Sequence, residues 1–186
     1  MCSALGAQVH GFAPKTPRDV AFHLMVPRHK QNGSTSAVAP EARSSLRRAG
    51  WKPTRSVRTS ICEEAYAHEG LQLLPKPKAF LRKFGGLVIP YVTKSQQQDV
   101  LDFLAERAIR GMKHGIKGFE KLLVTAPLCP VGHYLFGTCI LLMDRKGQIF
   151  GGSDETLTRV GNTGEKAISN ILGGIDAEIL ENASKK

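Results

Sequence analysis

Apolar residues recur at helical spacing between residues 95 and 123. At 100° per residue most of them fall on one half of a helical wheel, while the charged residues fall on the other half. Ser95 to Gln98 has the spacing of a capping box, which favours a helix start at this point. The pattern therefore predicts a long amphipathic helix over residues 95–123. Its apolar positions are Val100, Leu101, Leu104, Ala105, Ala108, Ile109, Met112, Ile116, Phe119, Leu122 and Leu123.

Three glycines, Gly111, Gly115 and Gly118, fall on the apolar side of this predicted helix. Glycine destabilises a helix interior by about 1 kcal/mol relative to alanine, so three on one face need an explanation. Either another backbone packs closely against this face, or the helix breaks near Gly111 and a second one starts after Gly115. Both interpretations bury the same face, and the sequence leaves both open.

A run rich in β-forming residues follows, from His133 to Met143, and predicts one long strand. The segment before it, residues 127–130, contains two prolines and predicts a loop. Residues 144–147 (Asp-Arg-Lys-Gly) have the composition of a tight turn in which Gly147 takes a positive φ. Residues 148–150 then form the expected return strand.

The remaining segments complete the expected domain. Apolar residues keep helical spacing from Ile168 to Ile179, across Gly173 and Gly174, which predicts a C-terminal helix after a loop at residues 160–164. Residues 63–94 are expected to be an extended lead-in, because Pro75 and Pro77 interrupt any regular helix. The predicted fold class is α+β, a single domain over residues 95–186. In it an antiparallel sheet packs on the long amphipathic helix and the C-terminal helix.

Charge is distributed unevenly along the chain. Residues 1–62 contain ten Lys and Arg but two acidic residues, a net of +8, whereas residues 63–186 have a net of +2. A basic segment rich in Ser and Thr and poor in acidic residues is typical of an organelle-targeting leader. We therefore expect residues 1–62 to be a disordered transit segment. Its uncharged first 14 residues favour a plastid (chloroplast), with a mitochondrion as the alternative.

Several other functions find little support in the sequence. The longest apolar run, residues 134–143, is half the length of about 20 residues that a membrane-spanning helix requires. Cys129, His133 and Cys139 are metal-ligand types, but a continuous strand would hold His133 and Cys139 about 20 Å apart. Zinc ligands lie about 2 Å from one ion. The sequence therefore predicts no metal site.

Catalytic and nucleotide-binding motifs are also not recognised. Residues 161–166 (Gly-Asn-Thr-Gly-Glu-Lys) lack the spacing of a phosphate-binding loop. No nucleophile–base set can be read from local sequence, so we predict no catalytic residues and no cofactor. A basic stripe on the predicted helix, from Arg107 to Lys121, is expected to be a solvated face. Nucleic acid is a possible partner but not the favoured one.

The order of elements from residue 95 to residue 165 resembles the single Cache family of small-ligand sensory domains. The matching pieces are the run from Tyr134 to Met143, the turn at residues 144–147, the return strand at 148–150 and the Val160–Asn162 loop. PAS and profilin domains share this layout. The resemblance implies a sensor-like fold whose sheet and nearby loop bind a ligand or partner. The site residues that it implies are Tyr134, Phe136, Thr138, Gly161 and Asn162.

The expected function is therefore non-catalytic. We expect an organellar soluble domain that binds a small-molecule ligand or docks as an accessory subunit on a larger organellar protein complex. One alternative is an organellar enzyme whose site no local motif reveals. The other is an RNA- or ribosome-associated protein that uses the basic N-terminal arm.

Overall fold

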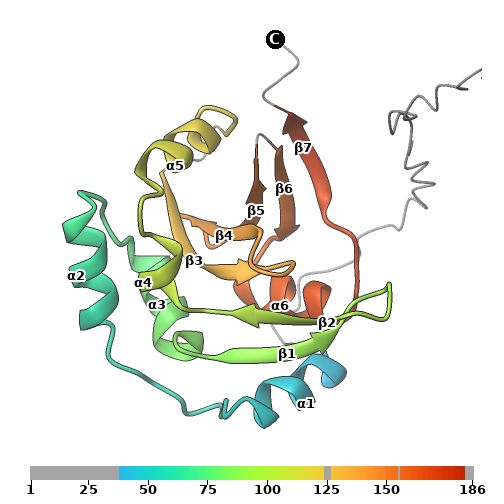
Figure 1. The fold of residues 1–186 in the computed structure, drawn as a ribbon. Coiled ribbons are helices and arrows are strands. Elements are labelled where there is room, and N and C mark those ends of the chain that lie inside the picture. The colour runs from blue at the N-terminus through green and yellow to red at the C-terminus, as the bar shows by residue number, and fades with distance from the viewer. Residues whose placement is uncertain (1–37, 124–126, 155, 183–186) are drawn as a thin grey trace, which may run out of the picture. The chain divides into compact units, whose positions relative to one another are not determined.

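Seven strands, joined in chain order, form one antiparallel sheet with helices on both faces (Figure 1). The computed structural model describes residues 38–123, 127–154 and 156–182. The strands are β1 (Val88–Val92), β2 (Gln98–Asp102), β3 (Leu128–Tyr134), β4 (Cys139–Asp144), β5 (Ile149–Ser153), β6 (Thr156–Gly161) and β7 (Glu178–Asn182). The helices are α1 (Pro40–Arg48), α2 (Ser60–His68), α3 (Pro75–Phe84), α4 (Ala105–Ala108), α5 (Lys113–Glu120) and α6 (Gly164–Leu172). The predicted α+β class is confirmed.

The sheet curls strongly between β2 and β3. These two strands share one residue pair, Asp102 with His133, whereas β3 and β4 are paired along their whole length. With so little pairing to align them, β1 and β2 run across the direction of β5 and β6, and α6 lies against the concave side (Figure 1). The curl brings the β3–β4 turn close to β2.

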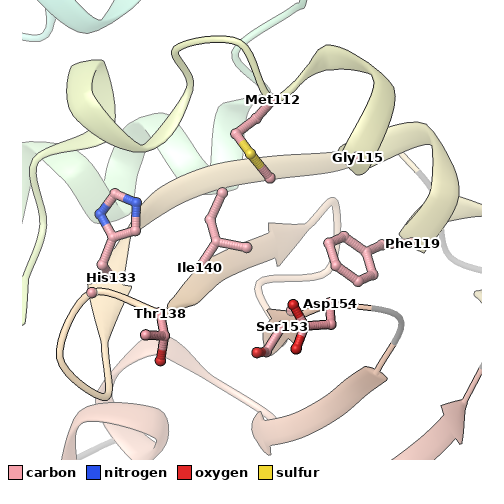
Figure 2. Close-up of a pocket in the computed structure, with 10 residues that line it drawn as sticks. Met112, Gly115, Phe119, His133, Thr138, Ile140, Ser153 and Asp154 are labelled. Carbon is pink, nitrogen blue, oxygen red and sulfur yellow. The ribbon is translucent and has the colours of Figure 1, made fainter.

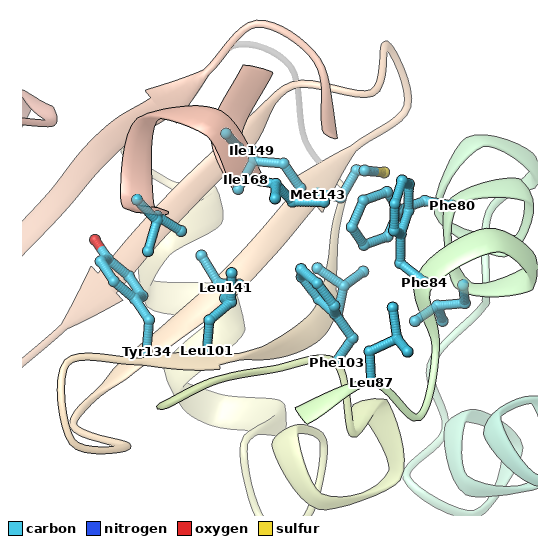
Figure 3. Close-up of a cluster of buried hydrophobic side chains, with 14 of the residues drawn as sticks. Phe80, Phe84, Leu87, Leu101, Phe103, Tyr134, Leu141, Met143, Ile149 and Ile168 are labelled. Carbon is cyan, nitrogen blue, oxygen red and sulfur yellow. The ribbon is translucent and has the colours of Figure 1, made fainter. Parts of the chain in front are cut away.

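Apolar side chains cover both faces of the central strand β4, all six residues of which are buried. Leu141 and Met143 face the larger core, which contains the aromatic side chains of Phe80, Phe84 and Phe103 (Figure 3). Ile140 and Leu142 face a smaller core that α5 completes with Ile116 and Phe119. A strand buried on both faces reads as a continuous apolar run rather than an alternating one.

The predicted helix over residues 95–123 is wrong for its first half. Residues 98–102 form strand β2, in which Asp99 and Leu101 point inward and Val100 outward, an alternation of period two. Ser95 lies in the β1–β2 turn and does not cap a helix. One of the inward positions is a carboxylate, Asp99, so the strand alternation does not appear as a hydrophobic pattern. The segment therefore fits a helical period instead.

The predicted break near Gly111 is confirmed, but the second helix begins at Lys113 and contains Gly115 rather than starting after it. Gly111 has a φ of +66° and separates α4 from α5. A Cβ placed on Gly115 would meet only the terminal methyl of Met112, and one on Gly118 would meet nothing within 4 Å. Among the residues that the structure describes, no other backbone packs closely against these two glycines.

The predicted strand over residues 133–143 is two strands. β3 ends at Tyr134, the chain turns at residues 135–138, and β4 begins at Cys139. The predicted loop at residues 127–130 belongs mostly to β3. His133 pairs with Ile140, so the argument that a continuous strand separates His133 from Cys139 is wrong. The turn at residues 144–147 and the return strand after it are confirmed, with Gly147 at a φ of +91°.

The C-terminal helix is shorter than predicted. Helix α6, capped by the Thr163 hydroxyl, ends at Leu172. Gly174, at a φ of +62°, reverses the chain so that the N–H of Ile175 donates to the carbonyl of Asn170. This glycine-dependent stop ends the helix despite the apolar spacing beyond it. Ile179 lies instead in the edge strand β7 and is 60% exposed.

Residues 38–94 are more regular than predicted. Helix α3 begins at Pro75 and contains Pro77, which a first helical turn tolerates because its N–H groups need no partner within the helix. Helix α1 packs on α6, where the N–H of Ala39 donates to the Ser169 hydroxyl. The ring of Trp51 stacks on Phe84. The expected disorder and extension are therefore wrong for residues 38–94, while residues 1–37 lie outside the described residues.

Candidate functional site

A groove of about 300 Å³ lies between α5 and the sheet face that carries the smaller core (Figure 2). Apolar side chains of Met112, Phe119 and Ile140 form much of its wall. Polar side chains stand around them, and three glycines keep the groove open. These further lining residues are His133, Thr138, Ser153, Asp154, Gly115, Gly137 and Gly152.

A pair of glycines in β5 makes room for one aromatic ring on each face of the sheet. A Cβ on Gly152 would lie 2.7 Å and 2.8 Å from two ring carbons of Phe119. A Cβ on Gly151, on the opposite face, would lie 2.6 Å from the hydroxyl of Tyr134. Since real Cβ atoms do not approach other atoms so closely, Gly152 is required for Phe119 to line the groove.

The lining residue His133 lies beside a buried carboxylate. The buried carboxylate of Asp102 lies 3.6 Å from Nδ1 of His133 and 3.7 Å from a guanidinium nitrogen of Arg107. Burial alone would raise the pKa of Asp102, but His133, the N–H of Leu104 and the charge of Arg107 together hold this pKa below its usual value. Asp102 therefore has partners within its own chain, the Arg107 guanidinium and the His133 ring.

The β3–β4 turn beside the groove has an unusual backbone. Leu135, Phe136 and Gly137 have φ values of 52°, 57° and 75°, so three successive residues adopt the left-handed region. This region costs a non-glycine residue about 1–2 kcal/mol. The side chains of Leu135 and Phe136 are nevertheless 42% and 60% exposed. Backbone strain concentrates at functional sites, and here it presents two apolar side chains to solvent.

The carboxylate of Asp99, on β2, holds this turn in place. Its Oδ1 accepts hydrogen bonds from the N–H groups of Phe136, at 2.8 Å, and Val100, at 2.6 Å. Its Oδ2 accepts one from the hydroxyl of Tyr91, which lies across the β1–β2 pair. Burial and this bond to Asp99 raise the pKa of Tyr91. Asp99 is 4% exposed, so a buried carboxylate holds the tip of the turn, Leu135 and Phe136, in position.

The structure brings together two of the five predicted site residues. Phe136 is exposed at the tip of the turn, and Thr138 lines the groove and donates a hydrogen bond to the Leu135 carbonyl. Tyr134 faces the larger core next to Leu101 and Leu141 (Figure 3). Burial raises its pKa. Gly161 is buried against Ala167 of α6. Asn162 is exposed in the β6–α6 turn and does not line the groove.

Most of the residues that build this site are not among the five predicted from the sequence. Asp99 was assigned to the polar face of a helix, and Met112 and Phe119 were assigned to its core face. His133 was considered only as a metal ligand, and Asp154 is not among the predicted site residues. The signal that could have identified the turn is the Phe-Gly-Thr sequence at residues 136–138, because glycine inside a β-forming run often marks a turn or bulge.

The described residues offer little reactive chemistry. Burial raises the pKa of the Cys129 and Cys139 thiols to about 11, so both stay protonated and are poor nucleophiles at neutral pH. In the part of the chain that the structure describes, no three His, Cys, Asp or Glu side chains gather as a metal site would require. Within the same residues no helix has the length and hydropathy to span a membrane.

Comparison with known proteins identifies the family. The sequence model of the SUKH-3 immunity protein family matches residues 38–174. No curated protein and no solved structure matches the chain. The resemblance to single Cache sensor domains is therefore wrong, and so are the predicted organellar sensor or accessory subunit and its alternative, an organellar enzyme. The expectation of non-catalytic binding is compatible with the family. The family match gives no support to a transit peptide and does not test the cellular location. The chain belongs to the SUKH-3 immunity protein family.

Proposed function

We propose that this protein is an immunity protein that binds a toxin protein and blocks its action, without chemistry of its own. The observation that carries the proposal is the family match, which covers most of the described residues, including the groove and the β3–β4 turn. The buried, protonated thiols agree with a role in binding rather than catalysis.

The surface that we assign to the toxin is the β3–β4 turn together with the adjoining groove. Binding energy in protein interfaces concentrates in a few large side chains near the centre of the contact. Leu135 and Phe136 fit this description, because both are exposed and the turn that carries them is already ordered. A pre-ordered tip loses less conformational entropy on binding than a flexible loop would.

A second exposed apolar area lies on the β1–β2 hairpin, where Val88, Val92 and Val100 are 46%, 55% and 40% exposed. Exposed β-branched residues are common on sheet surfaces and need no partner to explain them. The turn is favoured over this area because it is strained, anchored by a buried carboxylate and adjacent to a groove.

Capture of the toxin, followed by a growth assay, tests the proposal. The tagged full chain is used to isolate partner proteins from the cells that produce it, and each captured protein is then expressed in a bacterial host. A toxin should arrest growth when expressed alone, and co-expression of the full chain should restore growth. The proposal is wrong if no captured protein is toxic, or if toxicity persists when the two proteins are produced together.

The Ile61→Ala variant provides a matched control for this assay. Ile61 is 69% exposed and lies on α2, which contributes no residue to the groove. It should protect the host as well as the unchanged chain does, whereas Phe136→Ala should protect less. Equal protection by both variants would place the toxin-binding surface elsewhere.

A further inference from the structure

We propose that the groove receives a basic side chain, Arg or Lys, of the partner protein, with its charged group at Asp154 and its aliphatic part along Phe119 and Met112. The inference deepens the proposed function, because it names the chemistry of the partner at this surface. It rests on the different electrostatic situations of two carboxylates, Asp154, which lines the groove, and Asp102, which lies beside the lining residue His133.

The carboxylate of Asp102 already has partners within its own chain. Arg107 and His133 lie within 4 Å of it, and the side chain is 7% exposed. Asp154 differs, because it is exposed and none of the Lys, Arg or His side chains in the described part of the chain lies within 4 Å of its carboxylate. The groove therefore has one negative charge that the described residues leave unbalanced.

The walls next to Asp154 suit a cation on an aliphatic stem. Phe119 lies at the same end of the groove as Asp154 (Figure 2). The close approach of Gly152 fixes the position of its ring. A guanidinium or ammonium group near both would interact with the carboxylate and with the ring face. The methylene groups of Arg or Lys would then contact Met112, since such side chains bury their stems on apolar surface.

Size and solvation favour this occupant over the alternatives. The groove, at about 300 Å³, is at the lower limit of small-molecule sites and suits one long side chain. A purely apolar side chain would remove Asp154 from water without giving it a partner, which is unfavourable. An acidic side chain would add repulsion between like charges. Of these three kinds of side chain, only a basic one can pack its aliphatic part on the apolar walls and also give the Asp154 carboxylate an opposite charge.

The experiment is an NMR titration of the ¹⁵N-labelled full chain with N-acetylarginine amide and, separately, N-acetylcitrulline amide. The two probes have nearly the same shape, but citrulline has no charge. We expect arginine to shift the backbone amide signals of residues 137–138 and 152–154, and citrulline to bind at least tenfold more weakly. Equal responses to both probes, or responses confined to other residues, would overturn the inference.

The Asp154→Asn variant separates charge from shape. Asp154 has a φ of +48°, a region that asparagine also adopts readily, so this substitution should preserve the turn. It should weaken arginine binding at least tenfold. The control is Asp176→Asn, which removes another exposed carboxylate, one that is paired with Lys94 and lies outside the groove. This control should bind arginine as the unchanged chain does.

Failure of this inference is distinguishable from failure of the proposed function. If the growth assay succeeds but arginine does not bind at Asp154, the protein is an immunity protein that uses different groove chemistry. If arginine binds as expected but no captured protein is toxic, the groove assignment stands and the proposed function fails.

Discussion

The carboxylate of Asp99 accepts a 2.8 Å hydrogen bond from the backbone N–H of Phe136, which joins β2 to the tip of the β3–β4 turn. The two residues are 37 positions apart in the chain, and the curl of the sheet brings them together. Asp99 is buried, whereas the Phe136 side chain is 60% exposed. The bond therefore holds an apolar side chain in solvent in a defined position.

Removing the Asp99 carboxylate should destabilise the fold. Asp99→Ala leaves the partly buried N–H of Phe136 and hydroxyl of Tyr91 without their acceptor, and a hydrogen bond to a charged group contributes about 1.5–3 kcal/mol. We expect the free energy of unfolding in urea to fall by at least that amount. Tyr91→Phe removes one donor and keeps the acceptor, so it should cost less. A smaller loss for Asp99→Ala than for Tyr91→Phe would contradict the anchoring role.

The left-handed backbone at Phe136 predicts a reversed order of stability for two substitutions. At ordinary positions alanine is more stabilising than glycine by about 0.5–1 kcal/mol. At Phe136, with a φ of 57°, alanine keeps the strain and glycine relieves it, so Phe136→Gly should be more stable than Phe136→Ala by roughly 1 kcal/mol. Glu64, exposed within α2, is the matched control, where Glu64→Ala should be more stable than Glu64→Gly. The same order at both positions would show that the turn is not strained.

Two glycines, Gly152 in β5 and Gly118 in α5, predict opposite effects of an added methyl group. Gly152→Ala forces a Cβ against the ring of Phe119 and should lower the free energy of unfolding by about 1–3 kcal/mol. Gly118→Ala, on α5, meets open space and should raise it by up to about 1 kcal/mol, because alanine favours the helix. Thermal unfolding of both variants checks this pair. A neutral Gly152→Ala would mean that Phe119 does not pack on β5 as described.

The sequence predicts some of these elements well and others poorly, for identifiable reasons. The hairpin turn at residues 144–147 follows from local chemistry, since Gly147 takes its positive φ and the Asp144 carboxylate accepts two backbone N–H bonds within the turn. The β3–β4 turn does not, because a left-handed Leu135 and Phe136 contradict residue preference and depend on Asp99 in another strand.

The strand β2 illustrates a second kind of limit. Its inward positions include a carboxylate, Asp99, so hydrophobic periodicity misses the alternation and favours a helix. The predicted length of the C-terminal helix is wrong for a local reason instead. Gly174 ends the helix although the apolar residues continue at helical spacing beyond it. The groove depends on tertiary contacts between α5 and β5, for which the sequence has no short-range signal.

Acid should weaken the fold through Asp102. Its pKa is lower in the folded protein than the ordinary value of 3.8, so ionised Asp102 stabilises the fold above that pH. This contribution is lost as the pH falls through the folded pKa. Between pH 6 and pH 2, the free energy of unfolding of Asp102→Asn should therefore fall less than that of the unchanged protein. The free energies come from urea unfolding. If they changed equally with pH in the two proteins, ionised Asp102 would gain no stabilisation from Arg107 and His133.

The most direct test of toxin binding at the turn and groove is the dissociation constant of the captured toxin for the full chain and for Phe136→Gly, measured by calorimetry. The glycine variant relieves strain and keeps the fold, so its effect on affinity reports the lost side chain rather than unfolding. We predict that the dissociation constant of Phe136→Gly is at least thirtyfold larger than that of the unchanged chain, a loss of about 2 kcal/mol in binding free energy. An unchanged dissociation constant in a stably folded Phe136→Gly variant would contradict the account.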